Sequence, residues 1–124
     1  MSKSDEVLTS LSDLLRMDDV LACMLAKKGL EGLVPKGLKI KNIDLWKTIN
    51  QATNDLFTLI DKFYNYGIGR VYVELGEYTV TMVPISSQMA IIVITASLAN
   101  LGLLDVEMEN TRRQIKKILE SKTD

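Results

Sequence analysis

Few residues in this sequence have side chains suited to nucleophilic or acid–base catalysis. The chain has no histidine, which excludes Ser–His and Cys–His pairs and removes the commonest metal ligand. Its single cysteine, Cys23, lies inside an apolar stretch, where a thiol has a raised pKa and poor access to reagents. Core packing is therefore the preferred interpretation of Cys23, and the chain is predicted not to be an enzyme.

Sequence motifs for nucleotides, cofactors and metals are also missing. No Gly-x-x-x-x-Gly-Lys-Ser/Thr loop is present, so the chain is not expected to bind a nucleotide itself. Gly67-Ile68-Gly69 is too short for a phosphate loop and is better explained as the exit from a helix. The acidic residues do not have the spacing of a calcium loop. We predict neither a cofactor nor a metal site.

Length and composition favour one small intracellular domain. The chain has 124 residues, of which 47% are hydrophobic and 25% charged, and its net charge is −1. This size predicts a single domain, residues 1–124. The balanced charge argues against nucleic acid as a partner. The first residues lack the apolar core of a signal peptide, and a reducing cytoplasm is the predicted location.

A charge-free run of 27 residues, Tyr78 to Leu104, precedes a segment dense in Glu, Arg and Lys. A run of this length could cross a membrane, but Pro84 lies inside it and the residues before Pro84 alternate with period two. The run therefore predicts two strands. Tyr78–Val83 should have one buried and one more polar face, whereas Met89–Ala96 should be a central strand covered on both faces. No direct membrane insertion is predicted.

The remaining elements follow from apolar periodicity, caps and turn residues. The predicted order is helix, two strands, helix, three strands, helix. The other elements are a first helix capped by Ser4, a strand Val20–Ala26, a short edge strand within Leu30–Leu38, a long helix from Asn42 or Asp44 to about Asn65, a strand Arg70–Leu75 with the turn Gly76-Glu77, and a last helix from Leu103 to about Ser121.

The long helix has two apolar stripes about a quarter-turn apart. The first, here the Leu45 stripe, contains Leu45, Ile49, Ala52, Leu56, Leu59 and Phe63. The second, the Trp46 stripe, contains Trp46, Thr53, Phe57, Ile60 and Tyr64. A helix lying on a sheet needs one stripe, so we assign the Leu45 stripe to the core. The Trp46 stripe is then covered either by loops of the same chain or, as we prefer, by another protein.

The sequence resembles the roadblock family, the dynein-light-chain-like regulators that include bacterial and archaeal partners of Ras-like GTPases. The resemblance covers most of the chain, from Met17-Asp18-Asp19-Val20 to Leu119, and is to the prokaryotic, archaeal type. Its most specific part is Ala99-Asn100-Leu101-Gly102-Leu103-Leu104, between an apolar strand and the last amphipathic helix. Ser86-Ser87-Gln88 departs from the Asp-Gly pair of many relatives, and the stretch from Gly29 to Lys41 leaves the second strand short.

The resemblance implies an α+β, profilin-like fold. A single five-stranded antiparallel sheet would carry the long helix on one face and the N- and C-terminal helices on the other. Family members dimerise by pairing their third strands and placing their second helices side by side. Carried onto this sequence, that predicts a dimer or partner interface formed by Trp46, Asn50, Thr53, Phe57, Ile60, Tyr64, Arg70, Tyr72 and Glu74.

The function that the resemblance implies is a non-catalytic, dimeric protein-binding module. It would form a homodimer, or a heterodimer with a sister roadblock subunit, and regulate or scaffold a small Ras-like GTPase. One alternative is a structural subunit of a larger complex without effect on a GTPase. Another is a sensor that binds a small molecule between sheet and helix, an alternative disfavoured because the expected core residues are large and apolar.

Overall fold

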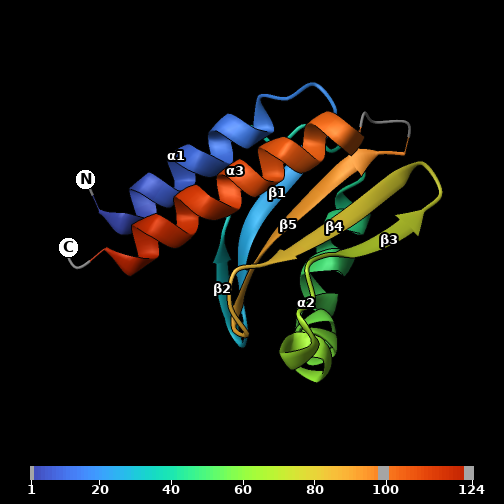
Figure 1. Cartoon of the computed structure of the whole chain (residues 1–124). Coiled ribbons are helices and arrows are strands. Elements are labelled where there is room, and N and C mark those ends of the chain that lie inside the picture. Colours follow the sequence, from blue (N-terminus) through green and yellow to red (C-terminus); the bar gives the residue numbers. More distant parts are fainter. Residues whose placement is uncertain (1, 98–100, 122–124) are drawn as a thin grey trace.

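The computed structural model describes residues 2–97 and 101–121. They form one antiparallel sheet of five strands, in the order β2-β1-β5-β4-β3, with helices on both faces (Figure 1). In chain order the elements are α1 (Lys3–Leu15), β1 (Val20–Lys27), β2 (Leu30–Leu33), α2 (Ile43–Phe63), the short 3-10 helix η1 (Tyr64–Tyr66), β3 (Val71–Leu75), β4 (Tyr78–Pro84), β5 (Met89–Ala96) and α3 (Leu101–Glu120). The predicted α+β architecture is confirmed.

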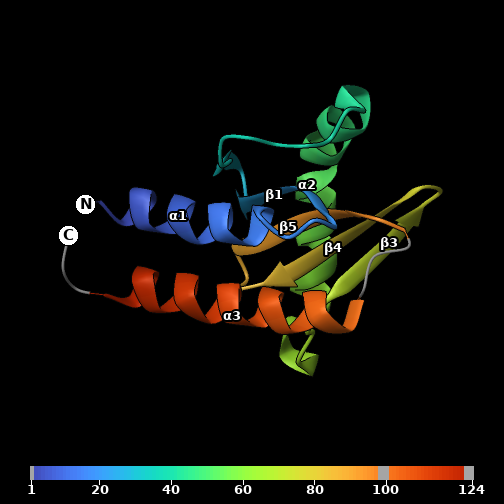
Figure 2. The same ribbon diagram turned by 90° about the horizontal axis from the view of Figure 1, so that it is seen from above.

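The helices divide between the two faces of the sheet as predicted. Helices α1 and α3 lie side by side and antiparallel on one face, and α2 crosses the other face (Figures 1 and 2). The start of α1 therefore lies beside the end of α3, where the Lys3 amine donates a hydrogen bond to the backbone carbonyl of Ser121.

The central strands supply both halves of the core because their side chains alternate between the two faces. On β1, Cys23 and Leu25 pack under α1 and α3, whereas Met24 packs under α2. Strand β5 divides in the same way, and its residues Ala90 to Thr95 are all buried. The apolar runs of β1 and β5 were thus correctly interpreted as interior strands.

The prediction that only one face of β4 would be buried is wrong. Thr79 and Thr81 are both buried, because the layer of α1 and α3 covers that face as well. Thr95 of the adjacent strand donates a hydrogen bond to the Thr79 carbonyl at 3.5 Å. The Thr81 hydroxyl has no hydrogen-bond partner among the described residues.

Caps and turns fix the ends of most elements. Asn42 is the N-cap of α2, and its side-chain oxygen accepts from the Leu45 N–H at 3.0 Å. Gly67, with a φ of 81°, follows η1 in the left-handed conformation that terminates helices. The N-cap predicted for α1 is wrong by two positions, since Ser2 and not Ser4 accepts from the Asp5 N–H.

Candidate protein interface

Strand β3 forms one edge of the sheet and pairs only with β4 in the described part of the chain. An edge strand presents backbone N–H and C=O groups that another strand can pair with. Val71 and Val73 point to the α2 face, where they pack against its core, and Leu75 is 40% exposed at the end of the strand. The opposite edge, β2, has only four residues, which makes β3 the longer open edge.

Contacts with the β1–β2 hairpin set the rotation of α2 about its axis. The Asn54 side-chain oxygen accepts from the Gly29 N–H at 3.2 Å, and Asp61 forms an ion pair with Lys28. These two contacts fix one flank of α2 toward β2. With about 100° per residue, the opposite flank faces the β3 edge, and this is the flank that carries Leu56, Leu59 and Phe63.

The flank of α2 on the β3 side is apolar and partly open to solvent. Leu59 is 37% and Phe63 48% exposed, while Leu56 is half-buried against the core. The Phe63 ring also contacts Tyr66 of η1, with 6.4 Å between the ring centroids. We use the name edge surface for the residues on this flank of α2 and on the α2 side of β3: Leu56, Leu59, Phe63, Val73 and Leu75.

The predicted assignment of the two stripes of α2 is wrong. Phe57 and Ile60 are fully buried, and Thr53 is buried with its hydroxyl donating to the Ile49 carbonyl at 3.0 Å. The core-facing side of α2 consists of Thr53, Phe57 and Ile60 of the Trp46 stripe together with Ile49. The exposed apolar flank belongs to the Leu45 stripe. Phe57, Ile60 and Thr53 therefore cannot present a free surface in this monomer.

The other predicted interface residues of α2 differ in accessibility. Trp46 is half-buried at the margin of the core. Asn50 is exposed, and its side-chain amide donates to the Trp46 carbonyl at 2.7 Å. Tyr64, at the end of α2, is an exposed aromatic residue. Among these three, Tyr64 alone has an aromatic ring open to a partner.

The residues predicted around β3 mostly contact α3. Arg70 forms an ion pair with Asp105 at 3.0 Å and lies 3.9 Å from Glu109. The Tyr72 hydroxyl donates to the Asp105 carboxylate at 3.1 Å. Glu74 is exposed. Arg70 and Tyr72 thus hold β3 against α3, a long-range contact that sequence reasoning did not find.

Glu109 is the centre of a charged cluster beside this contact. Arg112 donates two hydrogen bonds to its carboxylate, at 2.6 and 3.0 Å, and Arg113 donates one at 3.2 Å. The hydrogen bond from Arg112 lowers the pKa of Glu109 below its ordinary value and correspondingly raises the pKa of Arg112. These basic residues, suited by type to an acidic partner, are thus partly neutralised within α3.

Cys23 lies in the core beneath α1, where its thiol donates to the Leu11 carbonyl at 3.3 Å. Burial raises the pKa of Cys23 to about 12, and the charge of Lys39 opposes that rise. A thiol in this state is a poor nucleophile. Within the described residues, no three His, Cys, Asp or Glu side chains are grouped so that they could hold a metal ion. Across that same part of the chain, every helix is too short or too polar to cross a membrane.

The sequence matches no known family model and no curated protein. Solved structures do match the fold. MglB of Myxococcus xanthus aligns with 92% of this chain and 94% of its own length, at 15% identity and a TM-score of 0.75. A Roadblock/LC7 domain of Streptomyces avermitilis covers 91% of this chain and 97% of its own, at 18% identity and a TM-score of 0.68. A structure of MglB with a tetrameric arrangement covers 97% of this chain and 92% of its own, at 12% identity and a TM-score of 0.69.

The chain has the roadblock fold. The resemblance read from the sequence is thereby confirmed at the level of fold, over nearly the whole described chain. Part of its most specific motif, Ala99 and Asn100, lies outside the described residues. The remainder of that motif, Leu101 to Leu104, is the start of α3 in this roadblock fold.

Sequence reasoning missed Leu59 and Phe63 as exposed residues of α2. Both stripes of α2 contain apolar and aromatic residues, so the sequence pattern alone does not decide which stripe packs on the sheet. The deciding contacts are those of Asn54 and Asp61 with the hairpin at Lys28 and Gly29. These pairs are separated by 25 and 33 residues, and no local pattern indicates them.

Proposed function

We propose that this chain is a non-enzymatic protein-binding module of the cytoplasm that self-associates through the edge surface. The observation that carries the proposal is the open β3 edge lying beside an apolar flank of α2. A second copy related by a two-fold axis would pair its β3 with this β3 and place its α2 flank against this one. Each copy would then use the same residues, as an isologous interface requires.

Burial of the flank supplies a driving force for this association. Phe63, Leu59 and Leu75 are 48%, 37% and 40% exposed. Fully burying an apolar side chain of this size stabilises by roughly 1.5–3 kcal/mol. Only the part of this free energy that belongs to the still-exposed surface is gained on association, and in a symmetric dimer both copies contribute it. Backbone pairing along β3 adds hydrogen bonds and fixes the register. These gains oppose the entropic cost of association.

The proposed partner of the dimer is a small Ras-like GTPase. This step rests on the family resemblance of the sequence, and the likeness to MglB in a tetrameric arrangement supports assembly of the fold beyond one copy. The dimer, or a heterodimer with a sister subunit, would hold the switch loops of the GTPase and bias the nucleotide state that is populated. An assembly subunit without effect on a GTPase is the competing function.

Self-association is tested by measuring solution mass with light scattering after size exclusion. We expect a dimer for the wild type and a folded monomer for Phe63→Glu, because the new carboxylate would be buried without a partner in the dimer. Thr58→Glu is the matched control: it adds the same charge on an exposed position of the same helix, away from the edge surface. A wild-type monomer, or equal effects of the two substitutions, would contradict the proposed interface.

Partner choice is tested separately. Ras-like GTPases of the source organism are loaded with GDP or with a non-hydrolysable GTP analogue and titrated with the dimer. A clear preference for one nucleotide state supports regulation. Equal binding of both states favours the assembly subunit, and absence of binding to every GTPase would refute this partner class while leaving the dimer result intact.

A further inference from the structure

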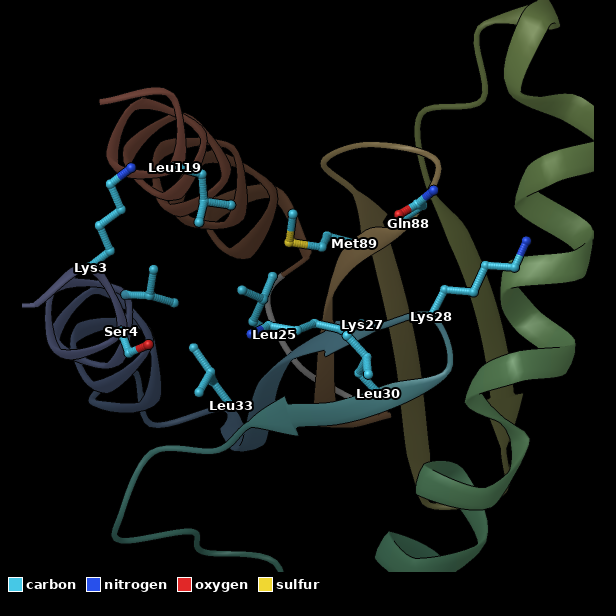
Figure 3. Close-up of a pocket in the computed structure, with 11 residues that line it drawn as sticks. Lys3, Ser4, Leu25, Lys27, Lys28, Leu30, Leu33, Gln88, Met89 and Leu119 are labelled. Atoms are coloured by element: carbon cyan, nitrogen blue, oxygen red, sulfur yellow. The ribbon is translucent and has the colours of Figure 1, made fainter. Parts of the chain in front are cut away.

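A cavity of about 230 Å³ opens on the α1/α3 side of the molecule, at the opposite end of the sheet from β3. Its walls come from the start of α1, the end of α3 and the β1–β2 hairpin (Figure 3). The apolar lining residues are Val7, Leu25, Leu30, Leu33, Met89 and Leu119. The cavity shares no lining residue with the edge surface.

Three neighbouring strands form the floor of the cavity. On β1, Leu25 and Lys27 are two residues apart and so point to the same face. Leu25 is aligned with Leu33 of β2 and Ile91 of β5, and Lys27 is aligned with Leu30 of β2 and Met89 of β5. Cys23, Leu25 and Lys27 therefore lie in one row on the same face of β1, and the row ends with the ammonium-bearing side chain of Lys27. Apolar neighbours flank that cation on both adjacent strands.

The three lysines of the cavity differ in where their amines lie. Lys3 points toward α3 and donates to the Ser121 carbonyl, and Lys28 points toward α2 and pairs with Asp61. Lys27 alone extends along the cavity, and its amine ends beside Leu25 (Figure 3). Its amine has no hydrogen-bond or ion-pair partner among the described residues. None of the described residues that line the cavity is an Asp or Glu.

The Lys27 side chain is half-buried, and its ammonium lies beside an apolar cavity without a counter-charge among the described residues, a position that favours an added anion. A ligand that brings a carboxylate would pair with Lys27, and its hydrocarbon part would replace solvent against Leu25, Leu33 and Met89. If each methylene takes roughly the 30 Å³ that one water occupies in the liquid, the volume of about 230 Å³ suits a chain of about six to eight carbons. We propose that this cavity binds a medium-chain aliphatic carboxylate, with Lys27 as the residue that holds the carboxylate.

The proposal is tested with octanoate as the probe, by amide chemical shifts of the intact chain during a titration. We expect saturable shifts that gather on Leu25, Lys27, Leu33 and Met89. Across butyrate, hexanoate and octanoate, affinity should rise by about fourfold for each methylene that enters the cavity, because burial of a methylene is favourable by a nearly constant amount. Octan-1-ol has the chain without the charge, and it should bind about tenfold more weakly than octanoate.

Lys27→Met and Lys28→Met form a matched pair at adjacent positions. The first removes the ammonium inside the cavity and should abolish the preference for octanoate over octan-1-ol. The second removes the ammonium that pairs with Asp61 and should change octanoate affinity by less than twofold. Circular dichroism checks that both variants fold, and the wild-type comparison of octanoate with octan-1-ol remains decisive if either does not.

Three results would overturn the proposal. The first is the absence of saturable shifts at millimolar octanoate. The second is a set of shifts spread over the exposed apolar residues of α2 and α3, which would indicate nonspecific binding. The third is equal weakening by Lys27→Met and Lys28→Met, which would mean that a general electrostatic attraction and not the cavity selects the anion.

Discussion

Arg70, immediately before β3, and Asp105, in α3, are joined by an ion pair of 3.0 Å, and the same guanidinium also donates to the Asp105 carbonyl at 3.4 Å. Tyr72 donates to the same carboxylate. One carboxylate in α3 thus receives contacts from two residues at the edge of the sheet. This arrangement ties the last helix to the strand proposed to pair between copies.

Arg70→Gln should reduce the free energy of unfolding by about 1 kcal/mol, a modest value because the partly exposed pair is screened by solvent. Arg113→Gln is the control, since Arg113 is largely exposed and should have almost no effect. Urea unfolding measures both. We expect Arg70→Gln to leave the solution mass unchanged, because Arg70 contacts α3 and not the edge surface; dissociation of the dimer would place Arg70 in the interface.

Phe57→Ala and Phe63→Ala should differ in how they change the free energy of unfolding measured with urea. Phe57 is fully buried, so its truncation leaves a cavity and should cost about 3–5 kcal/mol at any protein concentration. Phe63 is about half exposed, so its truncation should change the stability of the monomer little. It should instead weaken the dependence of stability on protein concentration that a dimer produces. A large, concentration-independent loss for Phe63→Ala would place that residue in the core.

Cys23 should make the fold less stable in alkali. Its pKa is about 12 in the folded chain against an ordinary value of 9.0, so the unfolded chain loses this proton first as the pH rises. The contribution of the Cys23 thiol to the free energy of unfolding is fully present below about pH 9. It is lost as the pH rises toward 12, at about 1.4 kcal/mol per pH unit. The difference in unfolding free energy between wild type and Cys23→Ala, measured at pH 8 and pH 10, should shrink by about 1.4 kcal/mol. A constant difference would contradict the raised pKa.

Glu109 should titrate below its ordinary range because Arg112 hydrogen-bonds to its ionised form. The stabilisation that follows is present above the unfolded pKa and is lost as the pH falls through the lower, folded pKa. Carboxyl chemical shifts of Glu109, followed through an acid titration, measure this directly. Arg112→Gln should return the pKa toward its ordinary value, whereas Arg113→Gln should move it less, since the Arg112 hydrogen bond is the largest cause.

Much of the fold could be predicted from local patterns. The apolar runs of β1 and β5, the alternation in β3, the N-cap at Asn42 and the helix stop at Gly67 are properties of neighbouring residues, and they located the elements to within a few positions. The burial of Thr79 and Thr81 could not be predicted in this way. Alternation gives two faces to a strand, but the second layer that covers the polar face comes from a distant helix.

The candidate interface was predicted less well, because its residues are defined by contacts between distant segments. The strand at the edge was located correctly, yet Phe57 and Phe63 exchanged roles relative to the prediction. Their places depend on the rotation of α2, which Asn54 and Asp61 fix from the hairpin side. The cavity at Lys27 was missed for a related reason: the strand was predicted to end at Ala26, whereas β1 continues to Lys27.

The position of β5 between β1 and β4 also constrains the route by which the chain folds. Strands β3, β4 and β5 are consecutive and can form hairpins with short loops, whereas β1 must find β5 across 62 residues at Lys27 and Met89. Closing so long a loop is slow compared with forming a local hairpin. We therefore expect β3, β4 and β5 to pair first, and β1 to add to the edge of β5 afterwards. During synthesis, the β1–β2 hairpin would remain without its main partner until β5 has left the ribosome.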